Sequence, residues 1–441
     1  MCFEETVKCS LRKSLNIVKM YEWLLDLYVL DFFVDDHWSK LPLSWQEVFQ
    51  DMNPQSIGAL ISGKHINHML PLSFLALIKS VAALSLPRKR QCELESKILN
   101  SNDASGLPKL KNLFLKHVKL KKRHEISVMA DIVKMTGSEV DCDAVVDFGS
   151  GLGHLVRMLA YKHEFHAAGI ECQTQLTEEA RKLDLELEYT AKKHLDGESV
   201  AKLRQPSHFN ITLSSINQLD QMPLPETMQH YGLVGLHPCG DLGPLLLKHF
   251  VNSKNVKFIC VVGCCYMKLT CGSSGYPMSS YVATLDSGLS FVSREIACHA
   301  IEVYCERLIK GDYEDLKVHA YRSALERILL ANDPKLKHAP VRSIKHTNSL
   351  SFKQYCHLAT EKLNINLPTA HAWARGEADL EQWRRVVTVY SLRLALAPLV
   401  ETVILLDRVL YVLEHGLSCT IHPVFDPKIS PRNHIIIAKR K

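Results

Sequence analysis

The 441-residue chain lacks several features that mark secreted, fibrous or repeat proteins. Its first residues, Met1 to Thr6, have neither the basic segment nor the apolar run of a secretory signal. No internal repeat or low-complexity tract stands out, which argues against a solenoid or a fibrous array. The 14 cysteines are not accompanied by an export signal, so we expect reduced thiols and a location in the cytosol, the nucleus or both.

Long uncharged apolar runs are also missing. The most apolar segment, residues 392–413, contains four charged side chains and a proline, and its longest uncharged piece is Leu394 to Val400. Charged side chains are costly at the centre of a bilayer. We therefore predict a buried helix here, although a hydropathy scan can flag the segment as a membrane span.

The spacing of cysteines that is typical of zinc sites is not found either. Cys264 and Cys265 are adjacent, and together with Cys239 and Cys271 they do not form the usual pair of ligands separated by two to four residues. Thiols are common in protein cores. We predict no metal site from the sequence.

The composition that remains is that of an ordinary globular protein, with 46% hydrophobic and 23% charged residues. The net charge of +6 is unevenly placed, because the window from Lys109 to Glu125 has seven basic residues and one acid. Such a cluster can be a footprint for phosphates or simply a solvated helix face. Within it, Lys121, Lys122 and Arg123 are candidate substrate-binding residues.

One stretch, Val145 to Leu155, organises the rest of the chain. A β-branched apolar run ends in an acid, glycines follow at alternate positions, and a segment with helical spacing begins, which predicts a strand, a tight turn and a helix. Glycines there allow positive φ and close approach to a ligand, and the free amides of the helix start suit polar groups of a nucleotide-like molecule. The predicted cofactor residues of this stretch are Asp147, Gly149, Ser150, Gly151 and Gly153.

A second acid supports a nucleotide-like ligand. Residues 165–171 read as the next strand, ending in Glu171, which follows Asp147 by 24 positions. An acid at the tip of the second strand, about 20 residues after the glycine turn, can accept hydrogen bonds from ribose hydroxyls. Further strands are predicted at 210–216, 233–237 and 256–263, alternating with helices, and a terminal hairpin at 418–426 and 434–439. Asn217, after the third strand, is a weaker candidate for the adenine side.

These patterns predict an α/β fold with a parallel sheet covered by helices on both faces. We expect a helical N-terminal domain over residues 1–100, a linker at 101–108, and a Rossmann-like domain over 109–441, with a helical insertion at about 283–415 before the final hairpin. Because ligands bind at the carboxyl ends of parallel strands, the segments 235–242 and 263–269 should face the substrate. Their candidate residues are His237, Asp241, Cys264, Cys265 and Tyr266.

The glycine spacing with its preceding acid resembles the S-adenosylmethionine loop of Rossmann-like methyltransferases. Five stretches carry a more specific resemblance: Gly235-Leu-His-Pro-Cys-Gly-Asp-Leu242, Gly263-Cys-Cys-Tyr-Met-Lys-Leu269, Lys121-Lys-Arg-His-Glu125, Phe33-Val-Asp-Asp-His-Trp38 and Ser430-Pro-Arg-Asn433. Together they resemble the methyltransferase-like protein 25 family, and most closely its 25B branch, which is also described as ribosomal RNA adenine dimethylase domain-containing.

This resemblance implies an S-adenosylmethionine-dependent methyltransferase. Methyl transfer from a sulfonium needs an aligned nucleophile, and a base only for a hydroxyl or a charged amine. His237 and Asp241 are the catalytic candidates, although His237 can equally shape the turn and Asp241 can cap the following helix. The Asp/Asn-Pro-Pro-aromatic signature of adenine N6 enzymes is absent after the fourth strand. RNA is the favoured substrate class, and a protein substrate or a non-catalytic scaffold remains the alternative.

Overall fold

The structure is a computed structural model that describes residues 2–89, 118–194, 197–201, 203–213, 218–219, 221–312, 314–344, 349–363, 365 and 370–440. The chain divides into two compact units. The first combines Met1–Arg12, Leu86–Gly288 and Thr402–Lys441, and the second combines Lys13–Ser85 with Leu289–Glu401. Each unit is made of segments that are far apart in the sequence.

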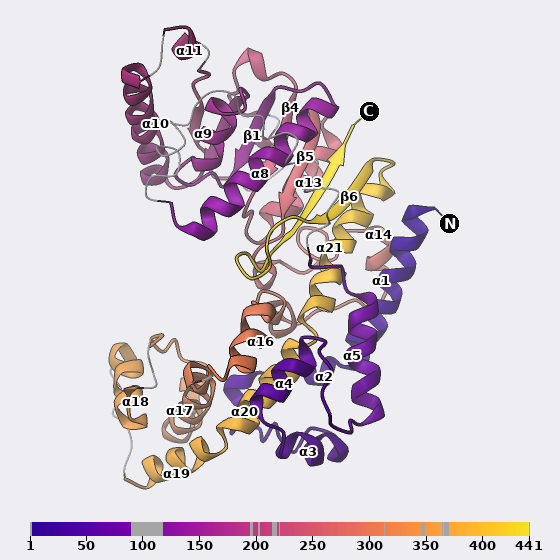
Figure 1. Ribbon diagram of the computed structural model, residues 1–441, viewed down its shortest axis with the longest axis vertical. Helices are drawn as coiled ribbons and strands as arrows, with labels where there is room; N and C mark the ends of the chain where they lie inside the picture. The colour runs from indigo at the N-terminus through magenta and orange to yellow at the C-terminus, as the bar shows by residue number, and fades with distance from the viewer. Residues whose placement is uncertain are drawn as a thin grey trace. The chain divides into compact units, whose positions relative to one another are not determined.

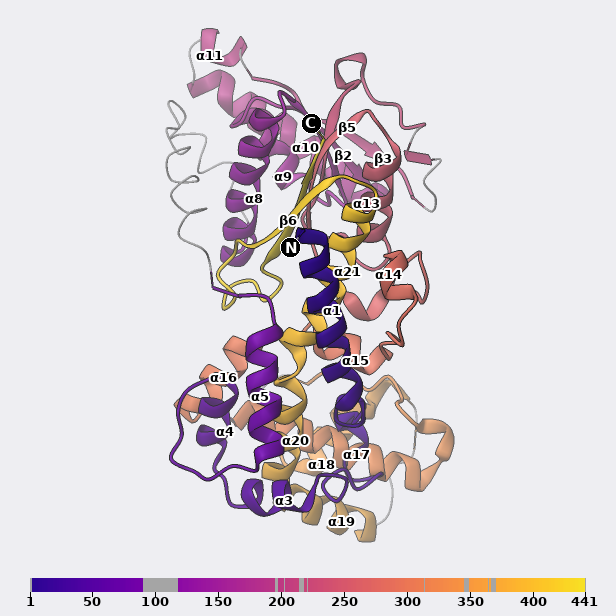
Figure 2. The ribbon, with the colours of Figure 1, turned by 90° about the vertical axis from the view of Figure 1, so that its right-hand side faces the viewer.

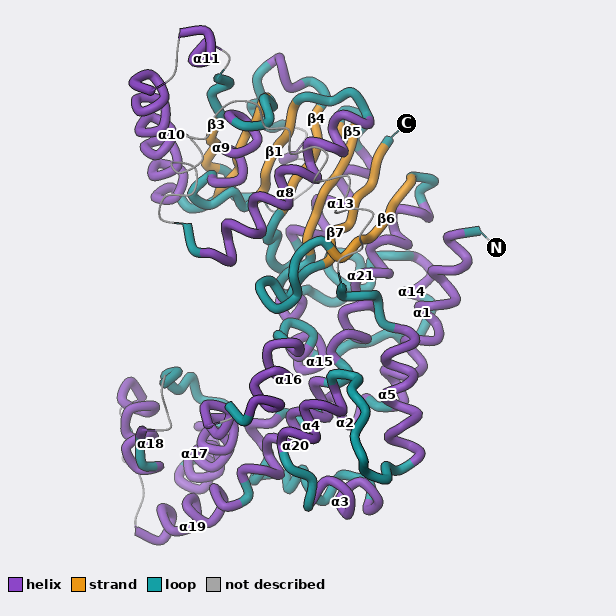
Figure 3. The backbone as a smooth tube through the Cα atoms, viewed as in Figure 1, coloured by secondary structure: helices purple, strands orange, loops and turns teal. Residues whose placement is uncertain are grey.

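A single seven-stranded sheet forms the centre of the first unit (Figure 3). The strand order is β3-β2-β1-β4-β5-β7-β6, and only β7 and β6 run antiparallel to their neighbours. The strand order reverses between β1 and β4, and the carboxyl edge at such a reversal is where parallel sheets bind ligands. The strands are β1 (Ala144–Phe148), β2 (His166–Glu171), β3 (Ser207–Asn210), β4 (Tyr231–Gly235), β5 (Val256–Val262), β6 (Ser418–Pro423) and β7 (His434–Lys439).

Helices cover both faces of this sheet, and Figure 2 shows α8 and α13 on opposite sides of the strands. The alternation of side chains explains the two layers, because successive strand residues face opposite sides. In β5, Phe258, Cys260 and Val262 belong to the core beneath α8 and α9, so the intervening residues face α13. The helices of this unit are α8 (Leu120–Glu139), α9 (His154–Tyr161), α10 (Thr174–His194), α11 (Gly197–Ala201), α13 (Leu242–Asn252) and α14 (Ser280–Ala283).

The second unit is helical throughout its described part. Its helices are α2 (Glu22–Leu25), α3 (Leu43–Gln50), α4 (Pro54–Ile61), α5 (Leu72–Leu84), α15 (Phe291–Ile296), α16 (Ile301–Lys310), α17 (Val318–Asn332), α18 (Phe352–Thr360), α19 (Ala370–Glu381) and α20 (Trp383–Leu394) (Figure 1). Two longer helices, α1 (Phe3–Met20) and α21 (Ala397–Glu414), contribute residues to both units.

The helical unit contains other parts of the chain than the helical N-terminal domain that we predicted at 1–100. Helices from the start of the chain pack against helices that were expected to form an insertion at 283–415 of the 109–441 domain. Gly58 of α4, for example, lies so close to α16 that a Cβ there would be 2.6 Å from the Cβ of Leu308. Periodicity shows that a helix has an apolar face, but it does not show which helix covers that face. The predicted linker at 101–108 lies outside the described residues.

Most strands lie where the sequence predicts them, and the third is the exception. The prediction was 210–216, whereas β3 covers Ser207–Asn210 and pairs in parallel with Ala168 to Glu171 of β2. The apolar residues after Asn210 mimic a strand pattern, but among the described residues 211–213 the pairing continues at Ile211 alone, through its amide to the Glu171 carbonyl at 3.0 Å. Residues 214–216 of the predicted strand lie outside the described residues. The predicted terminal hairpin is confirmed, with β7 inserted between β5 and β6.

Among the described residues, one helical stretch, Trp383–Glu414, is long and apolar enough to cross a membrane by length and composition alone. It contains α20 and α21, and 94% of its most apolar window is buried inside the protein. Buried charged side chains of this stretch, such as Asp407 and Arg408, have protein neighbours rather than an apolar surrounding. This burial agrees with the predicted core helix.

Candidate functional site

The glycine loop between β1 and α9 has the conformation that its sequence predicts. Gly149, Gly151 and Gly153 all have positive φ, at 71°, 55° and 69°. The amides of Gly149 and Ser150 donate to the carbonyl of Ile170 in β2, at 2.9 and 3.1 Å. The loop is therefore fastened to the neighbouring strand, and it turns directly into α9.

Glu171 lies at the tip of β2 and closes the other side of this loop. Its carboxylate accepts hydrogen bonds from the Gly151 amide (3.0 Å) and from the Gln173 amide (3.0 Å), and its side chain is 7% exposed. The Cys172 thiol also donates to Oε1, at 3.4 Å, so Oε2 is the oxygen that can still accept from a ligand hydroxyl. The acid predicted to hold a ribose thus lies beside the glycine loop.

Asp147, the other predicted acid, is 4% exposed. Its carboxylate has no hydrogen bond to another described residue, and burial raises its pKa to about 8 while the nearby Lys122 opposes that rise. A buried carboxyl group without a partner is costly when it is ionised. A cationic or hydrogen-bonding group of a ligand would relieve that cost.

The loop borders open space at Gly151 but is packed against the sheet at Gly153. A Cβ added at Gly151 would meet nothing within 4 Å, whereas one at Gly153 would lie 2.5 Å from Cε1 of His208. The Oγ of Ser150 is buried and has no hydrogen-bond partner among the described residues. Gly151 therefore borders open space, while Gly153 permits close packing of the loop on the sheet.

A buried charge network that we did not predict holds the loop from below. Arg157 of α9 donates from Nε to Asp184 (2.5 Å), and from Nη2 to the carbonyl of Leu152 in the loop (3.1 Å). Asp184 also bonds Nε2 of His208 at 2.7 Å. The sequence did contain a signal for this network: Arg157 lies among apolar residues of the helix His154–Tyr161. A buried arginine needs partners.

The turn after β4 and two distant segments meet at a second cluster. Nε2 of His237 lies 3.1 Å from Oε2 of Glu125, and the hydroxyl of Ser430 donates to Oε1 of Glu125 at 2.5 Å. Burial alone would raise the pKa of Glu125, but the hydrogen bonds from His237 and Ser430 hold it below its ordinary value. Nδ1 of His237 is buried and has no hydrogen-bond partner in the described residues.

Residues from three of the motifs that resemble one family meet in this cluster. Glu125 ends the Lys121-Lys-Arg-His-Glu125 motif, His237 belongs to the segment 235–242, and Ser430 opens the Ser430-Pro-Arg-Asn433 motif. Sequence analysis singled out each motif but did not predict that they touch. No pattern in one sequence connects positions separated by 112 and 305 residues.

Asp241 links the turn after β4 to the loop after β5. Its Oδ1 accepts from the Thr270 amide at 2.9 Å, and it makes no side-chain cap at the start of α13. The predicted capping alternative is therefore wrong, because the side chain is turned to the neighbouring loop instead. Further along that loop, Asp407 of α21 accepts from the amides of Met278 (2.7 Å) and Ser279 (3.0 Å).

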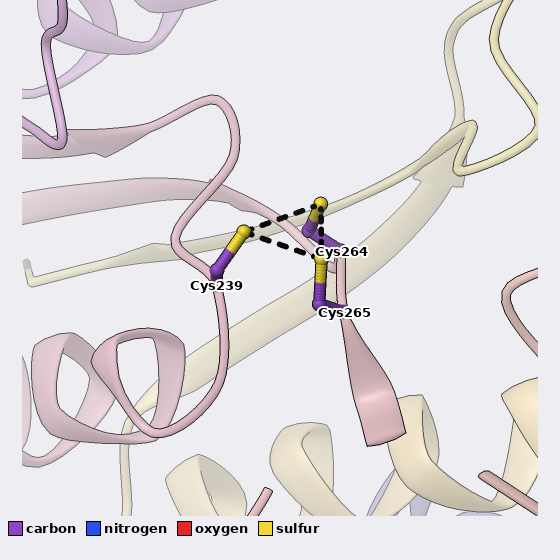
Figure 4. Close-up of side chains that lie close together, drawn as sticks. All are labelled: Cys239, Cys264 and Cys265. Atoms are coloured by element: carbon purple, nitrogen blue, oxygen red, sulfur yellow. Dashed lines mark hydrogen bonds between the residues drawn. The ribbon is translucent and has the colours of Figure 1, made fainter. Parts of the chain in front are cut away.

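Three cysteines gather at the ends of β4 and β5, as Figure 4 shows. The Sγ of Cys239 lies 3.8 Å from that of Cys264 and 3.3 Å from that of Cys265, and the two adjacent sulfur atoms are 3.5 Å apart. Hydrogen bonding from Cys264 lowers the pKa of the Cys239 thiol to about 5, and the pKa of Cys264 is raised in return. The sequence did not predict this grouping, because its residues lack a regular spacing.

The other predicted substrate-binding residues differ in their surroundings. Tyr266 is 1% exposed, and the Arg408 guanidinium lies 5.8 Å from its ring centre, so its ring packs inside the protein and does not offer a substrate surface. Lys121 and Lys122 are exposed at the start of α8, and Arg123 donates to the Val118 carbonyl at 2.6 Å. Asn217 and the basic residues at 109–117 lie outside the described residues.

A family model described as a methyltransferase domain matches residues 121–272, which contain the glycine loop, Glu171 and the cysteine cluster. This segment is a methyltransferase domain. The sheet that this segment forms together with the terminal hairpin, in which an antiparallel β7 lies beside β5, is the Rossmann-like methyltransferase fold that the sequence predicts.

Two curated relatives confirm the resemblance to the methyltransferase-like protein 25 family. The chain is 27% identical over 266 residues to the mouse protein named probable methyltransferase-like protein 25, and 29% identical over 230 residues to its human counterpart. The matches cover 55% and 47% of this chain, but only 43% and 37% of those proteins. The chain therefore spans less than half of their length, and the assignment to the 25B branch stays a prediction.

Solved structures of methyltransferases also align with the chain. The plantazolicin methyltransferase BamL, solved with a triazolic desmethylPZN analog and SAH, is 12% identical, has a TM-score of 0.25, and is matched over 79% of this chain and 97% of its own. Coclaurine N-methyltransferase, bound to N-methylheliamine and SAH, is 10% identical with a TM-score of 0.24, over 97% and 100% of the two chains. These values are too low to guide residue roles.

Proposed function

We propose that this protein transfers a methyl group from S-adenosylmethionine to RNA. The observation that carries the cofactor assignment is the contact between the Glu171 carboxylate and the Gly151 amide at 3.0 Å, at the edge of open space. This contact supports Glu171 as the acceptor for a ribose, because it lies beside a loop that borders open space. The methyltransferase domain matched at residues 121–272 supports the same assignment.

Glu171 and the loop would hold the nucleoside half of the cofactor. Both carboxylate oxygens of Glu171 are fixed by backbone amides, so the carboxylate is oriented before a ligand arrives. A ribose hydroxyl can then donate to the remaining acceptor position of Oε2. Gly151, where an added Cβ would meet nothing within 4 Å, keeps the open side of the loop free of a side chain that would block the nucleoside.

Asp147 would hold the amino acid half. Its carboxyl group is buried, has no hydrogen bond to another described residue, and has a pKa raised to about 8. The ammonium of the methionine moiety is the group of S-adenosylmethionine that can stabilise the ionised form of such a carboxyl. Cofactor binding would then replace the unpaired, buried carboxyl of Asp147 by an ion pair between Asp147 and the ammonium.

His237 is the residue we assign to proton transfer. The bound sulfonium supplies an electrophilic methyl group, and the protein has to align the acceptor atom with it. His237 lies at the carboxyl edge of β4, next to β1 in the sheet, and Glu125 holds its Nε2 at 3.1 Å. Its Nδ1 has no partner among the described residues but is buried, so it can accept the proton of a substrate hydroxyl once the turn after β4 shifts to expose it. Asp241, bound to Thr270, positions the loop instead.

RNA is favoured by the cations near this edge. Lys121 and Lys122 are exposed on the first turn of α8, and the charge of Lys122 acts on Asp147. Exposed lysines next to a cofactor site suit a phosphate backbone. The sequence has further basic residues at 109–117, which lie outside the described residues.

Cofactor binding is tested by calorimetric titration with S-adenosylmethionine and S-adenosylhomocysteine. Gly151→Arg should abolish binding, because its side chain would fill the open space beside the loop. Gly416→Arg is the matched control, since Gly416 also has positive φ (71°) and open surroundings but lies before β6. Equal binding by both variants, or no binding by the folded wild type, would remove the cofactor assignment.

The substrate is tested by labelled-methyl transfer to RNA and protein fractions, combined with RNA affinity at several salt concentrations. Lys121→Glu with Lys122→Glu should weaken RNA binding and reduce the salt slope by about 2. The matched control, Lys192→Glu with Lys193→Glu, changes exposed lysines at the end of α10. Label in protein only, or stable binding to one protein without RNA affinity, would favour a protein methyltransferase or a scaffold.

A further inference from the structure

The cysteine cluster, defined here as Cys239, Cys264 and Cys265, suits a chemistry that methyl transfer does not require. We infer that these three sulfur atoms bind a zinc ion, with a fourth coordination position left open. The sequence pointed away from a metal, and the structure provides the geometry that spacing did not show. The inference stands apart from the proposed activity, because a metal can bind here whether or not S-adenosylmethionine does.

The distances between the sulfur atoms match tetrahedral coordination. A zinc–sulfur bond of about 2.3 Å requires sulfur atoms about 3.8 Å apart at the corners of a regular tetrahedron. The three separations here are 3.3, 3.5 and 3.8 Å. An ion placed roughly 1 Å out of their plane would be about 2.3 Å from all three sulfur atoms, so small shifts of the side chains would suffice.

The ligands come from two loops that other contacts already hold together. Cys239 lies in the turn after β4, and the other two follow β5, its neighbour in the sheet. Asp241 of the first loop bonds the Thr270 amide of the second at 2.9 Å. Binding therefore meets a largely formed site, which lowers the entropic cost of bringing the ligands together.

Positive groups surround the cluster and can offset the charge of three thiolates on one divalent ion. The charges of Lys268 and His237 act on Cys239, and the charge of Arg408 acts on Cys264. Arg408 is 3% exposed, and its Nε has no hydrogen-bond partner among the described residues. A net negative metal centre would stabilise this buried guanidinium.

Exposure indicates an open fourth position. Cys239 is exposed, and Cys264 and Cys265 are half-buried, so the cluster borders solvent instead of lying in the core. Structural zinc sites usually have four protein ligands, whereas sites with three keep a place for water or another ligand. Zinc binding here would brace the two loops that border the acceptor side of the sheet.

A second group with possible ligands, Asp31, Glu326 and His338 of the helical unit, has a simpler explanation. His338 bonds both carboxylate oxygens of Asp31 through Nε2, at 2.8 and 3.0 Å, and its amide donates to Glu326 at 2.7 Å. Its polar atoms satisfy one another without a metal. The thiols of the cysteine cluster contact one another through sulfur–sulfur contacts, and sulfur is a poor donor and acceptor of hydrogen bonds.

The experiment measures metal content of the full chain by mass spectrometry, after loading with zinc under reducing conditions and dialysis against a weak chelator. We expect one zinc ion per chain, with the thiol protons released on binding. Cobalt in its place should give the thiolate charge-transfer absorption and the visible bands of a tetrahedral site. Cys239→Ser, Cys264→Ser and Cys265→Ser should each lose the metal or bind it much more weakly.

Cys142→Ser is the matched control, because Cys142 is a half-buried thiol that lies before β1, at the opposite edge of the sheet, and bonds only carbonyl oxygens. It should retain the metal fully. A folded wild type that takes up neither zinc nor cobalt would overturn the inference. So would equal uptake by a triple serine variant whose circular dichroism is native, or a disulfide within the cluster that persists in reductant. Titration with S-adenosylmethionine is scored separately and does not bear on the metal.

Discussion

Nε2 of His237 and Oε2 of Glu125 lie 3.1 Å apart, although 112 residues separate them in the chain. The contact joins α8 to the turn after β4, and Ser430 completes it from the terminal hairpin. The Glu125 carboxylate is held by two partners, so it fixes the orientation of the His237 imidazole. Nε2 of the ring faces Glu125, and Nδ1 faces away from it. The geometry assigns Glu125 a positioning role behind His237.

We predict that Glu125→Gln lowers the methyl-transfer rate more than it weakens cofactor binding. The amide can still accept from Ser430, but it cannot stabilise a protonated His237. A pH profile distinguishes this role from a structural one, because the pH dependence of the rate should shift in Glu125→Gln and vanish in His237→Asn. An unchanged pH profile of the rate in Glu125→Gln would argue against the positioning role of Glu125.

The same variant has a consequence for stability. The pKa of Glu125 is lowered in the folded protein, so its ionised form contributes stability above its ordinary pKa, and that contribution is lost as pH falls through the lower, folded-state value. The free energy of unfolding of Glu125→Gln should be smaller than that of the wild type at pH 7, by about 1–3 kcal/mol. Denaturant titrations at pH 7 and in acid should show this gap narrowing. A difference in the free energy of unfolding that stays the same at both pH values would contradict the lowered pKa of Glu125.

Cofactor affinity should depend on pH through Asp147. Its pKa of about 8 keeps the carboxyl largely protonated at neutral pH, and an ammonium on the ligand would favour the ionised form. Affinity should therefore rise between pH 6 and about 8, with proton release on binding, and fall again when the ligand's own amino group deprotonates. Calorimetry in buffers of different ionisation enthalpy measures this release, and Asp147→Asn should remove it.

Gly151 and Gly153 should respond differently to the same small change. Both have positive φ, but only the Cβ at Gly153 would collide with His208, at 2.5 Å. Gly151→Ala should cost about 1 kcal/mol of stability from backbone strain, and Gly153→Ala should cost more because the loop has to move off the sheet. Thermal unfolding of the two variants side by side gives the comparison, and equal losses would count against the packing argument.

Breaking the buried pair of Arg157 and Asp184 should destabilise the protein strongly. Arg157→Met leaves the carboxylate of Asp184 buried with only His208 as a partner, and such losses are about 3–5 kcal/mol. It also frees the Leu152 carbonyl, so the remaining folded protein should bind the cofactor more weakly. Arg204→Met is the control, because Arg204 pairs with an exposed acid, Asp143. Similar losses in both variants would contradict the difference in burial.

Sequence patterns predicted the elements whose signals are local. The run from Val145 to Leu155 specifies strand, turn and helix within eleven positions, and the structure confirms each part. The third strand was misplaced because Ile211 and Leu213 have a strand-like pattern, whereas the true strand contains the polar Ser207 and His208. Pairing with β2, a contact distant in sequence, decides the outcome there.

The unpredicted parts of the site depend on contacts between distant segments. Asp241 precedes a helix, which is the position of a cap, yet its side chain bonds Thr270 because the loop after β5 supplies a closer amide. Cys239 and Cys265 are 26 residues apart and meet only because β4 and β5 are neighbours. Sequence analysis identified which residues carry chemistry, and topology determined which of them act together.

The position of β7 affects how this protein can be divided experimentally. β7 pairs with β5 from Phe258, opposite Lys439, to Val262, opposite Ile435. A fragment restricted to the matched domain, residues 121–272, would leave the apolar β5 as an open sheet edge with unpaired amides and carbonyls. Such edges recruit other strands, so that fragment should aggregate unless the distant hairpin, 418–439, is supplied in the same chain or as a separate peptide.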